Sequence, residues 1–472
     1  MKTILQSRWF QLAVLVVLVL GSRWFFLSDG YGVEEDSWGL VVNAYEMHDS
    51  GHYIASRVPG HPVEEYAYLF FHDASPFVYN FFSAVFAAAA ICFFFLSLRK
   101  ICPACAWPGA LAFAFVPVFY IAGTYTADYT WTLAFVMLAF WLLLENKLVA
   151  CGLMIGMAIG CRITAGAFLL PFLLLVWDRR SFAISFRKAL LIGIPATMVG
   201  ILWFIPSYMN HGASFFDYSD QFPYPPLAKI IYKASIGVFG LVGMIAVTLG
   251  FIAGIYLWKK RRIRETTTVR VDRLLWVCLL IIVLHIFSYL RLPQKSAYMI
   301  PIIPFVILFL AVTLSRRSFN IVCGAMAVSS FCCSINLTDP LRGSESTASS
   351  VTFHIAGQEI FFDPLSGPVF SERSKRLRKL EYCRKVIEQV NSTMQKTAII
   401  AGWWYNELVA ERYHQPLKTT NVEYKFYCTC AEMEELISRG YVVTFLPEQD
   451  LYNDQMFGQQ CTGQLAKPFT LK

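Results

Sequence analysis

Charged residues are scarce in this 472-residue chain, where Lys and Arg total 40 and Asp and Glu total 32. Apolar residues make up 56% of the sequence and aromatic residues 16%. A chain with so little charge and so much apolar surface is typical of a polytopic membrane protein. The composition therefore argues against an ordinary soluble domain.

Several chemical motifs are also missing. The sequence contains no Gly-rich phosphate loop and no Walker motif, which argues against direct use of nucleoside triphosphates. His48 and His52 are four residues apart, and His61 and His72 follow, but no His-Glu-x-x-His motif accompanies them. We therefore favour polar-loop or substrate contacts for these histidines over a metal site. The residues require no cofactor, and a divalent cation is left open.

Long apolar runs dominate residues 1–338 and alternate with short polar breaks. Their lengths predict about eleven membrane-spanning helices and a mainly α-helical transmembrane domain. The runs cover residues 9–27, 77–98, 107–124, 129–144, 148–161, 164–177, 189–207, 230–258, 274–290, 297–314 and 319–335.

Basic residues set the predicted orientation. Lys2 and Arg8 precede the first run, which is long for a signal peptide and is followed by no convincing cleavage site, so we expect a retained helix. Under the positive-inside rule the N-terminus faces the cytoplasm, and the loop 28–76 faces outward, from a plasma (inner) membrane. The basic groups that agree with this orientation are Arg99-Lys100, Lys147, 178–180, Arg187-Lys188, 259–264 and Arg316-Arg317.

Residues 339–472 predict a small α/β domain on the outer face, joined by the Ser/Thr-rich segment 343–352. Apolar residues recur at helical spacing over 371–390, with Ser371 as a candidate N-cap. Further elements are expected at 397–404 (a buried strand ending at a glycine turn), 432–439 (a helix) and 441–445 (a strand). In an oxidising space, the cysteines of this part could pair; they are Cys383, Cys428, Cys430 and Cys461.

An acidic cluster follows the first apolar run directly. Residues 36–47 predict an interfacial amphipathic helix, with Asp36 as its cap and Gly51 closing the turn after it. A carboxylate at the water boundary suits a general base that deprotonates an acceptor hydroxyl or amine. The alternative is that Asp36 only caps the helix while Glu34 and Glu35 are solvated, and the local pattern leaves both interpretations open.

Cations are few in the predicted outer loops, so those present there carry information. Each could be a headgroup anchor. Together with an acidic loop on the same face, they favour a site for a lipid phosphate, whose charge they would bind and stabilise. They are Arg57, Arg162, Lys229, Lys233, Arg291 and Lys295.

Several segments resemble the GT-C superfamily of glycosyltransferases. The acidic pair after the first run, the segment 46–53 and the segment 56–66 are similar to the first outer loop of these enzymes. Segments 156–164 and 291–304 resemble later parts of the same group. The nearest patterns are those of the protein O-mannosyltransferase-like and lipid A aminoarabinose transferase families.

This resemblance implies an enzyme that moves a hexosyl or pentosyl group from a polyprenyl-phosphate donor to a lipid, glycan or protein acceptor on the non-cytoplasmic face. It implies that Asp36 is the catalytic base and Glu35 its neighbour, although the order Glu-Glu-Asp, where many relatives show Asp-Glu, leaves open which carboxylate is the base. Together with the outer cations, it nominates these donor-phosphate or substrate-binding residues: Arg57, His61, Glu65, Asp128, Arg162, Arg291, Lys295 and Tyr298. The expected partners are membrane lipids, the donor and the acceptor, with no nucleic acid.

Other functions share parts of this pattern. A transporter or flippase of lipid-linked saccharides would also carry cations and acids, but usually near mid-membrane or in related halves. Here the middles of the predicted spans are almost free of charge, which favours chemistry at the membrane surface. A membrane acyltransferase or a ligase of whole lipid-linked glycans remains compatible with the residues.

Overall fold

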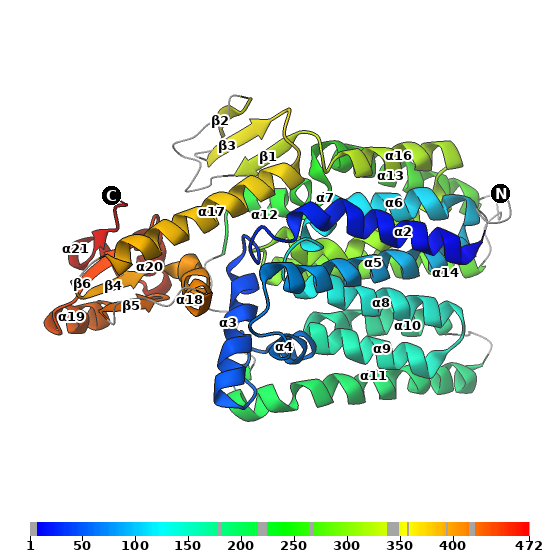
Figure 1. Cartoon of the computed structure of the whole chain (residues 1–472). Helices are drawn as coiled ribbons and strands as arrows, with labels where there is room; N and C mark the ends of the chain where they lie inside the picture. Colours follow the sequence, from blue (N-terminus) through cyan, green and yellow to red (C-terminus); the bar gives the residue numbers. More distant parts are fainter. Residues whose placement is uncertain are drawn as a thin grey trace.

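The computed structural model describes residues 7–177, 181–212, 214–215, 224–263, 269–337, 349–355, 358–392, 395–414 and 421–471. It combines a bundle of helices aligned along a common direction with a smaller unit of strands and helices at one end (Figure 1). The predicted inner charges at 178–180 and 264, and residues 343–348 of the predicted linker, lie outside the described residues.

The bundle contains long apolar helices together with shorter ones. Within the described residues, six helices are long and apolar enough to cross a membrane, namely Arg8–Phe26, Pro76–Ile101, Phe182–His211, Ile236–Lys260, Val271–Arg291 and Ser296–Thr313. Four shorter apolar helices accompany them, so the predicted total of about eleven crossings stays a prediction. The elements are α2 (Arg8–Arg23), η1 (Trp24–Phe26), α5 (Pro76–Ile101), η2 (Pro103–Cys105), α6 (Ala106–Phe115), α7 (Pro117–Ala122), α8 (Asp128–Leu144), α9 (Leu148–Cys161), η3 (Ile163–Phe168), α10 (Leu169–Val176), α11 (Phe182–His211), α12 (Leu227–Ala234), α13 (Ile236–Ile263), α14 (Val269–Arg291), η5 (Ser296–Ile302), α15 (Ile303–Thr313) and α16 (Arg316–Val328).

Small residues explain how closely some of these helices pack. Gly152, Gly156 and Gly160 recur every fourth residue on α9, on the face that contacts α11. A Cβ at Gly152 would lie 2.3 Å from the carbonyl oxygen of Ile192, so a larger side chain would push the two helices apart. In lipid the hydrophobic effect does not drive helices together. Small residues let the backbones come close, and the resulting van der Waals contacts stabilise the helix pair.

Two helices cover the end of the bundle opposite the N-terminus, α3 (Glu35–Ser50) and α4 (Pro62–Leu69) (Figure 1). The predicted helix over 36–47 is confirmed, and Gly51 ends it in the left-handed conformation with φ 72°. The capping role of Asp36 is wrong, because Glu34 is the N-cap residue and Asp36 lies inside the first turn. The predicted interfacial face is also wrong: Trp38, Val41 and Val42 are buried in a core that α3 shares with other parts of the protein.

The first strands form a small antiparallel sheet beside the bundle. Its order is β1-β3-β2, with β1 at Ser334–Leu337, β2 at Val351–Ile355 and β3 at Gln358–Asp363. Strand β1 precedes the predicted domain boundary at 338/339 and β3 follows it, yet β1 pairs with β3 over the whole length of β1. The chain therefore passes from the bundle into the terminal part through a shared sheet.

A parallel sheet forms the centre of the C-terminal unit, in the order β5-β4-β6-β7. The strand expected at 397–404 is confirmed as β4 but ends at Ile400, and the glycine turn follows it at Gly402, where a short 3-10 helix begins. The helix at 432–439 and the strand at 441–445 are confirmed as α19 and β6. The N-cap prediction at Ser371 is wrong, because the first helix of this unit begins at Pro368. The elements are α17 (Pro368–Asn391), β4 (Thr397–Ile400), η6 (Gly402–Trp404), α18 (Tyr405–His414), β5 (Val422–Lys425), α19 (Cys430–Ser438), β6 (Val442–Phe445), α20 (Gln449–Phe457), α21 (Thr462–Leu465) and β7 (Lys467–Pro468).

The cysteines of this unit divide into one pair and two thiols. Cys430 and Cys461 form a disulfide between the start of α19 and the residue before α21. Cys383 and Cys428 are free and buried. One of the pairings that the sequence allowed is therefore present.

Candidate active site

The loop between α2 and α3 carries the acidic cluster, and side chains from elsewhere hold its backbone. Asn80 is buried in α5 and donates through Nδ2 to the carbonyl oxygens of Leu27 (2.8 Å) and Gly30 (2.9 Å). The indole Nε1 of Trp38 donates to the carbonyl of Gly32 at 2.8 Å. Buried carbonyl groups need such partners, so these bonds fix the path of the loop into α3.

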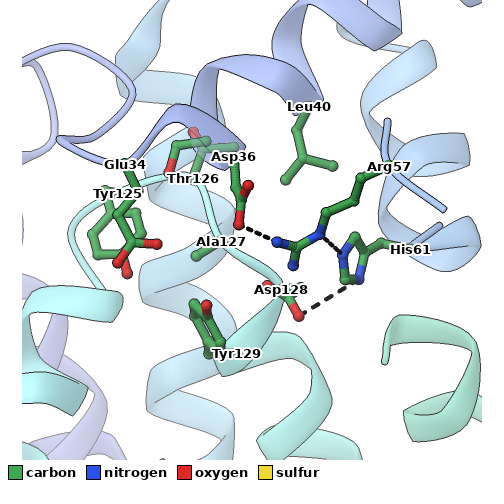
Figure 2. A pocket seen from close by; sticks show the side chains of 11 residues that line it. Glu34, Asp36, Leu40, Arg57, His61, Tyr125, Thr126, Ala127, Asp128 and Tyr129 are labelled. Atoms are coloured by element: carbon green, nitrogen blue, oxygen red, sulfur yellow. Dashed lines mark hydrogen bonds and ion pairs between the residues drawn. The ribbon is translucent and has the colours of Figure 1, made fainter. Parts of the chain in front are cut away.

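A second loop, between α7 and α8, lies against the first. The backbone N–H of Thr126 donates to the carbonyl of Tyr31 at 2.9 Å, and its hydroxyl donates to Oδ1 of Asn80 at 3.0 Å. This loop leads into Asp128, the first residue of α8. The two loops therefore bring the carboxylates near 36 and 128 to the same end of the bundle (Figure 2).

Asp36 is the centre of an ionic cluster. Its Oδ2 accepts from Nη1 of Arg57 and from Nζ of Lys295, and the same Nζ lies 2.9 Å from Oε2 of Glu34. Burial opposes ionisation of Asp36, but Arg57 and Lys295 outweigh it and lower its pKa. Likewise, burial opposes protonation of Lys295, and Asp36 and Glu34 raise its pKa well above the usual value. Asp36 is thus an ionised carboxylate held by two cations.

Glu35, its neighbour, faces another way. Its Oε1 accepts from Nδ2 of Asn406, in α18, at 2.9 Å. Burial and the charge of Asp36 raise the pKa of Glu35 to about 7. Glu35 lines neither of the two cavities described below, whereas Asp36 lines one of them.

A chain of polar contacts leads away from Asp36. Nε of Arg57 donates to Nε2 of His61 at 2.9 Å (Figure 2). Nδ1 of His61 lies 2.7 Å from the carbonyl oxygen of Cys161. These partners assign the proton of the neutral imidazole to Nδ1, and burial lowers the pKa of His61. Nδ1 also lies 3.5 Å from Oδ2 of Asp128.

Arg162 ends this chain of contacts. It forms an ion pair with Asp128, and its guanidinium lies 4.7 Å from the ring centroid of Tyr129 and 4.8 Å from that of Tyr298. A guanidinium at these distances is attracted to both aromatic faces. The structure therefore brings together most of the residues that the sequence nominated.

Two nominated residues lie elsewhere. Glu65 is fully buried and accepts from the hydroxyl of Tyr53 (2.5 Å) and from the backbone N–H (2.8 Å) and hydroxyl (2.6 Å) of Ser56, so it holds the loop before α4. Arg291 is exposed in the last turn of α14. Neither residue lines either cavity.

The cavity beside Asp36 is small. Its volume is about 10 Å³, which is room for about one water molecule. Its wall is formed by both loops, by α3, by the first residues of α8, and by Arg57 and His61, which precede α4 (Figure 2). The lining residues are Glu34, Asp36, Ser37, Leu40, Arg57, His61, Tyr125, Thr126, Ala127, Asp128 and Tyr129.

A larger cavity, of about 360 Å³, adjoins it and shares Glu34 and Tyr125. Lys295 lines this larger cavity while bonding Asp36 at the smaller one. One wall is apolar, with residues from α7 and α13, and strand β1 and the start of α17 supply another. The lysines that line the cavity are Lys229, Lys233, Lys295 and Lys375, and the acids are Glu34 and Glu372.

Two of these lysines have a lowered pKa. Burial and the charge of Lys229 lower the pKa of Lys233 to about 7, and burial and Lys375 lower the pKa of Lys229. Nζ of Lys233 donates to the carbonyl of Gln294. Repulsion between neighbouring ammonium groups is what a bound anion would relieve.

Sequence reasoning missed some residues of this region. Glu34 lines both cavities, and Lys375 reaches the larger one from α17. Glu64 is fully buried, and neither of its carboxylate oxygens has a hydrogen-bond partner among the described residues. Burial and Asp128 raise its pKa well above the usual value. Asn80 was also missed, although a polar side chain inside the apolar segment 76–101 needs a partner and was a local signal.

No group of three or more His, Cys, Asp or Glu residues in the described part of the chain is arranged to hold a metal ion. Instead, the ring of His48 stacks on that of His72 with centroids 3.7 Å apart. Gly51 ends α3 between His48 and His52, as the sequence predicted.

Comparison with protein-family models and with curated proteins finds no match. Two solved structures are similar over nearly the whole chain, both of ArnT from Cupriavidus metallidurans. The structure bound to undecaprenyl phosphate is 13% identical with a TM-score of 0.54, covering 97% of this chain and 89% of that one. The apo structure is 14% identical with a TM-score of 0.53, covering 98% and 90%.

This chain has the ArnT fold. ArnT is the lipid A aminoarabinose transferase, a GT-C glycosyltransferase, so the predicted resemblance is confirmed at the level of the fold. The ArnT-like fold and the six long apolar helices make the chain an integral membrane protein.

Proposed function

We propose that this protein is a membrane glycosyltransferase that moves a sugar from a polyprenyl-phosphate donor to an acceptor on the non-cytoplasmic face of the membrane. One observation carries the proposal: an ionised carboxylate, Asp36, is shared by Arg57 and Lys295 where a small polar cavity adjoins a larger, lysine-lined one. The fold is that of ArnT, one structure of which binds undecaprenyl phosphate. The acceptor is a lipid, a glycan or a protein.

The larger cavity suits the donor. Its apolar wall, which includes Val118, Ile121 and Leu241, offers contacts for an isoprenoid chain. Its lysines offer charge-assisted hydrogen bonds to a phosphate, which are stronger than neutral ones. Lys295 lies at the junction with the smaller cavity, so a phosphate bound there would place the anomeric carbon of the sugar toward Asp36.

The shared cations suggest how donor binding prepares the base. Arg57 and Lys295 lower the pKa of Asp36, so in the free protein this carboxylate is a weak base. A donor phosphate would compete for the same two cations, and the pKa of Asp36 would rise as they turn away from it. Asp36 then becomes a stronger base at the moment when the donor is in place.

Transfer follows as one displacement. Asp36 takes the proton of an acceptor hydroxyl or amine while that oxygen or nitrogen attacks the anomeric carbon. The bond between the anomeric carbon and the phosphate oxygen breaks, and its electron pair leaves with polyprenyl phosphate. Arg57 and Lys295 stabilise the negative charge that grows on the leaving phosphate. Attack opposite the leaving group inverts the anomeric configuration.

The orientation in the membrane is part of the proposal. The basic pairs Arg99-Lys100 and Arg316-Arg317 lie at the helix ends nearer the N-terminus, and the acidic cluster lies at the opposite end (Figure 1). By the positive-inside rule, the site and the unit 339–472 then face away from the cytoplasm. The disulfide Cys430–Cys461 agrees with an oxidising space there.

Paired substitutions test the base. We expect Asp36→Asn to lower transfer by about 100-fold or more, as loss of a general base does, while the protein stays folded. The matched control Glu35→Gln removes the adjacent carboxylate, which lines neither cavity, and we expect less than about 10-fold loss.

The assay uses proteoliposomes supplied with radiolabelled polyprenyl-phosphate hexoses and pentoses and with membranes from cells that lack the protein as the source of acceptor. Labelled sugar that becomes covalently attached to a membrane component supports transfer. Donor that only moves across the bilayer, with no covalent product from any sugar, would favour a flippase. Near-normal transfer by Asp36→Asn would remove Asp36 from the mechanism.

A further inference from the structure

Helix α17 presents cations to the loops that carry the acidic residues. Arg373 contacts Asp29 through Nε (2.6 Å) and Nη2 (3.4 Å). One turn later, Nη1 of the buried Arg376 donates to the carbonyl oxygens of Phe26 (3.3 Å) and Thr124 (3.0 Å), and Nη2 donates to the hydroxyl of Thr124 at 3.2 Å. Both loops of the site are therefore bound to one helix of the C-terminal unit.

Lys379, on the next turn of α17, reaches closest to the acidic cluster. Its Nζ donates to the carbonyl of Val33 at 3.0 Å and to that of Trp403 at 3.2 Å, and lies 3.0 Å from Oε2 of Glu407. Lys379 thus combines two hydrogen bonds to backbone carbonyls with a buried ion pair. Val33 directly precedes Glu34, which contacts Lys295.

The second contact with the acidic cluster comes from α18. Asn406 donates to Glu35 at 2.9 Å, next to the residue that we propose as the base. In Figure 1, α18 lies beside α3, and the two helices are in contact. Helices α17 and α18 therefore hold the acidic cluster from one side, and the cavities lie on its other side.

A purely structural role for Lys379 is the simpler alternative. Its side chain is 6% exposed and that of Glu407 is 1% exposed, so the lysine could serve only to neutralise a buried carboxylate. A buried ion pair contributes little net stability, however, and apolar residues of similar size often replace it without loss. If Lys379 served only the fold of the C-terminal unit, its hydrogen bond to Val33, in the acidic loop, would not be needed.

We propose that Lys379 is a positioning residue that sets the acidic loop of the active site through the carbonyl of Val33. The inference rests on the proposed function. Lys379 fixes the point at which the chain enters α3 and thereby the place of Asp36 between Arg57 and Lys295. A displacement of about 1 Å at a catalytic group can lower the rate about 100-fold. The C-terminal unit is therefore part of the active site.

The test separates positioning from stability with the double variant Lys379→Met/Glu407→Met. This variant removes both charges of the buried ion pair. The two carbonyls that lose their donor belong to Val33 and Trp403, which are half-buried and within reach of water, so the unfolding midpoint should stay near that of the wild type. We expect kcat to fall about 10-fold to 100-fold with the KM for the donor within about 3-fold, because the donor cavity is intact. Backbone amides of residues 33–37 should exchange hydrogen faster.

The matched control is Lys385→Met/Glu381→Met, an exposed ion pair on the same helix with an N–O distance of 2.7 Å. It should change neither kcat nor amide exchange at 33–37. If the double variant does not fold, Lys379→Gln replaces it, because an uncharged amide with two N–H donors cannot keep all three contacts of the ammonium group. The same two measurements then apply.

Each outcome is decisive. Wild-type kcat and unchanged exchange in the folded variant would overturn the positioning role and leave the proposed function intact. Faster exchange with unchanged kcat would also overturn it, since the loop would then be free without loss of rate. If the wild type transfers no sugar from any polyprenyl phosphate, the proposed function fails, and the exchange measurement alone decides whether Lys379 holds the loop.

Discussion

Replacing Asn80 by leucine would test how the acidic loop is held. Leucine has nearly the same size and suits the apolar surroundings of α5. It can neither donate to the carbonyls of Leu27 and Gly30 nor accept from the hydroxyl of Thr126. Asn80→Leu therefore changes the hydrogen bonding of both loops while leaving the volume of the core almost unchanged.

The magnitude follows from the number of groups that lose their partner. Asn80 is fully buried and Leu27 is 1% exposed, so water does not readily replace the lost bonds. A buried polar group without a partner costs roughly 1–3 kcal/mol, so two carbonyls and a hydroxyl predict a loss of about 3–9 kcal/mol. The loss should concentrate in the loops, because the helices keep their own hydrogen bonds.

Denaturant unfolding of the detergent-solubilised protein, followed by intrinsic tryptophan fluorescence, measures the overall loss. Hydrogen exchange at residues 27–37 measures the local one. The control Ser97→Ala is a buried position on the same helix whose hydroxyl donates only to the carbonyl of Phe93, one turn earlier, and it should change stability by less than about 1 kcal/mol. An Asn80→Leu variant with the midpoint and exchange of the wild type would refute this account of the loop.

Two further predictions concern charge and cross-linking. Because the pKa of Lys233 is lowered to about 7, its ammonium group is present below that pH and lost above it. The affinity for polyprenyl phosphate should therefore rise from pH 8 to pH 6. Lys233→Met should flatten this pH dependence. A pH profile that is the same in both proteins would contradict it. Cys430→Ser/Cys461→Ser removes a disulfide between residues 31 positions apart and should destabilise the C-terminal unit by about 2–4 kcal/mol, with wild type in reductant showing the same shift in unfolding. Equal stability with and without the disulfide would argue against its formation in the native protein.

Local patterns predicted several elements of the fold correctly. Apolar runs identified the helices of the bundle because hydropathy and length are properties of a single segment. The ends of the strand before Gly402 and of the helix before Gly51 were also predictable, because a turn in the left-handed conformation favours glycine wherever it occurs. The capping residues were harder: Ser371 and Asp36 suited a cap by type, but their helices begin three residues and one residue earlier, respectively.

The amphipathic face of α3 shows what a pattern leaves open. The spacing of Trp38, Val41 and Val42 predicts one apolar side, and that side exists. Its partner is protein and not lipid, because α4, α5 and the C-terminal α18 cover it. A sequence pattern indicates that a face must be buried but not what buries it.

By itself, the sequence determined that this is a membrane protein, where its charges lie along the chain, and that an acidic cluster follows the first helix. Only the tertiary structure decided which charges meet. Asp36, Arg57 and Lys295 come from three separate segments, and no local rule joins a carboxylate to an ammonium group 259 residues away. The tertiary structure also decided the different surroundings of the adjacent carboxylates Glu35 and Asp36. Consecutive helical residues point about 100° apart, so Asp36 faces the cavity with its cations while Glu35 faces Asn406.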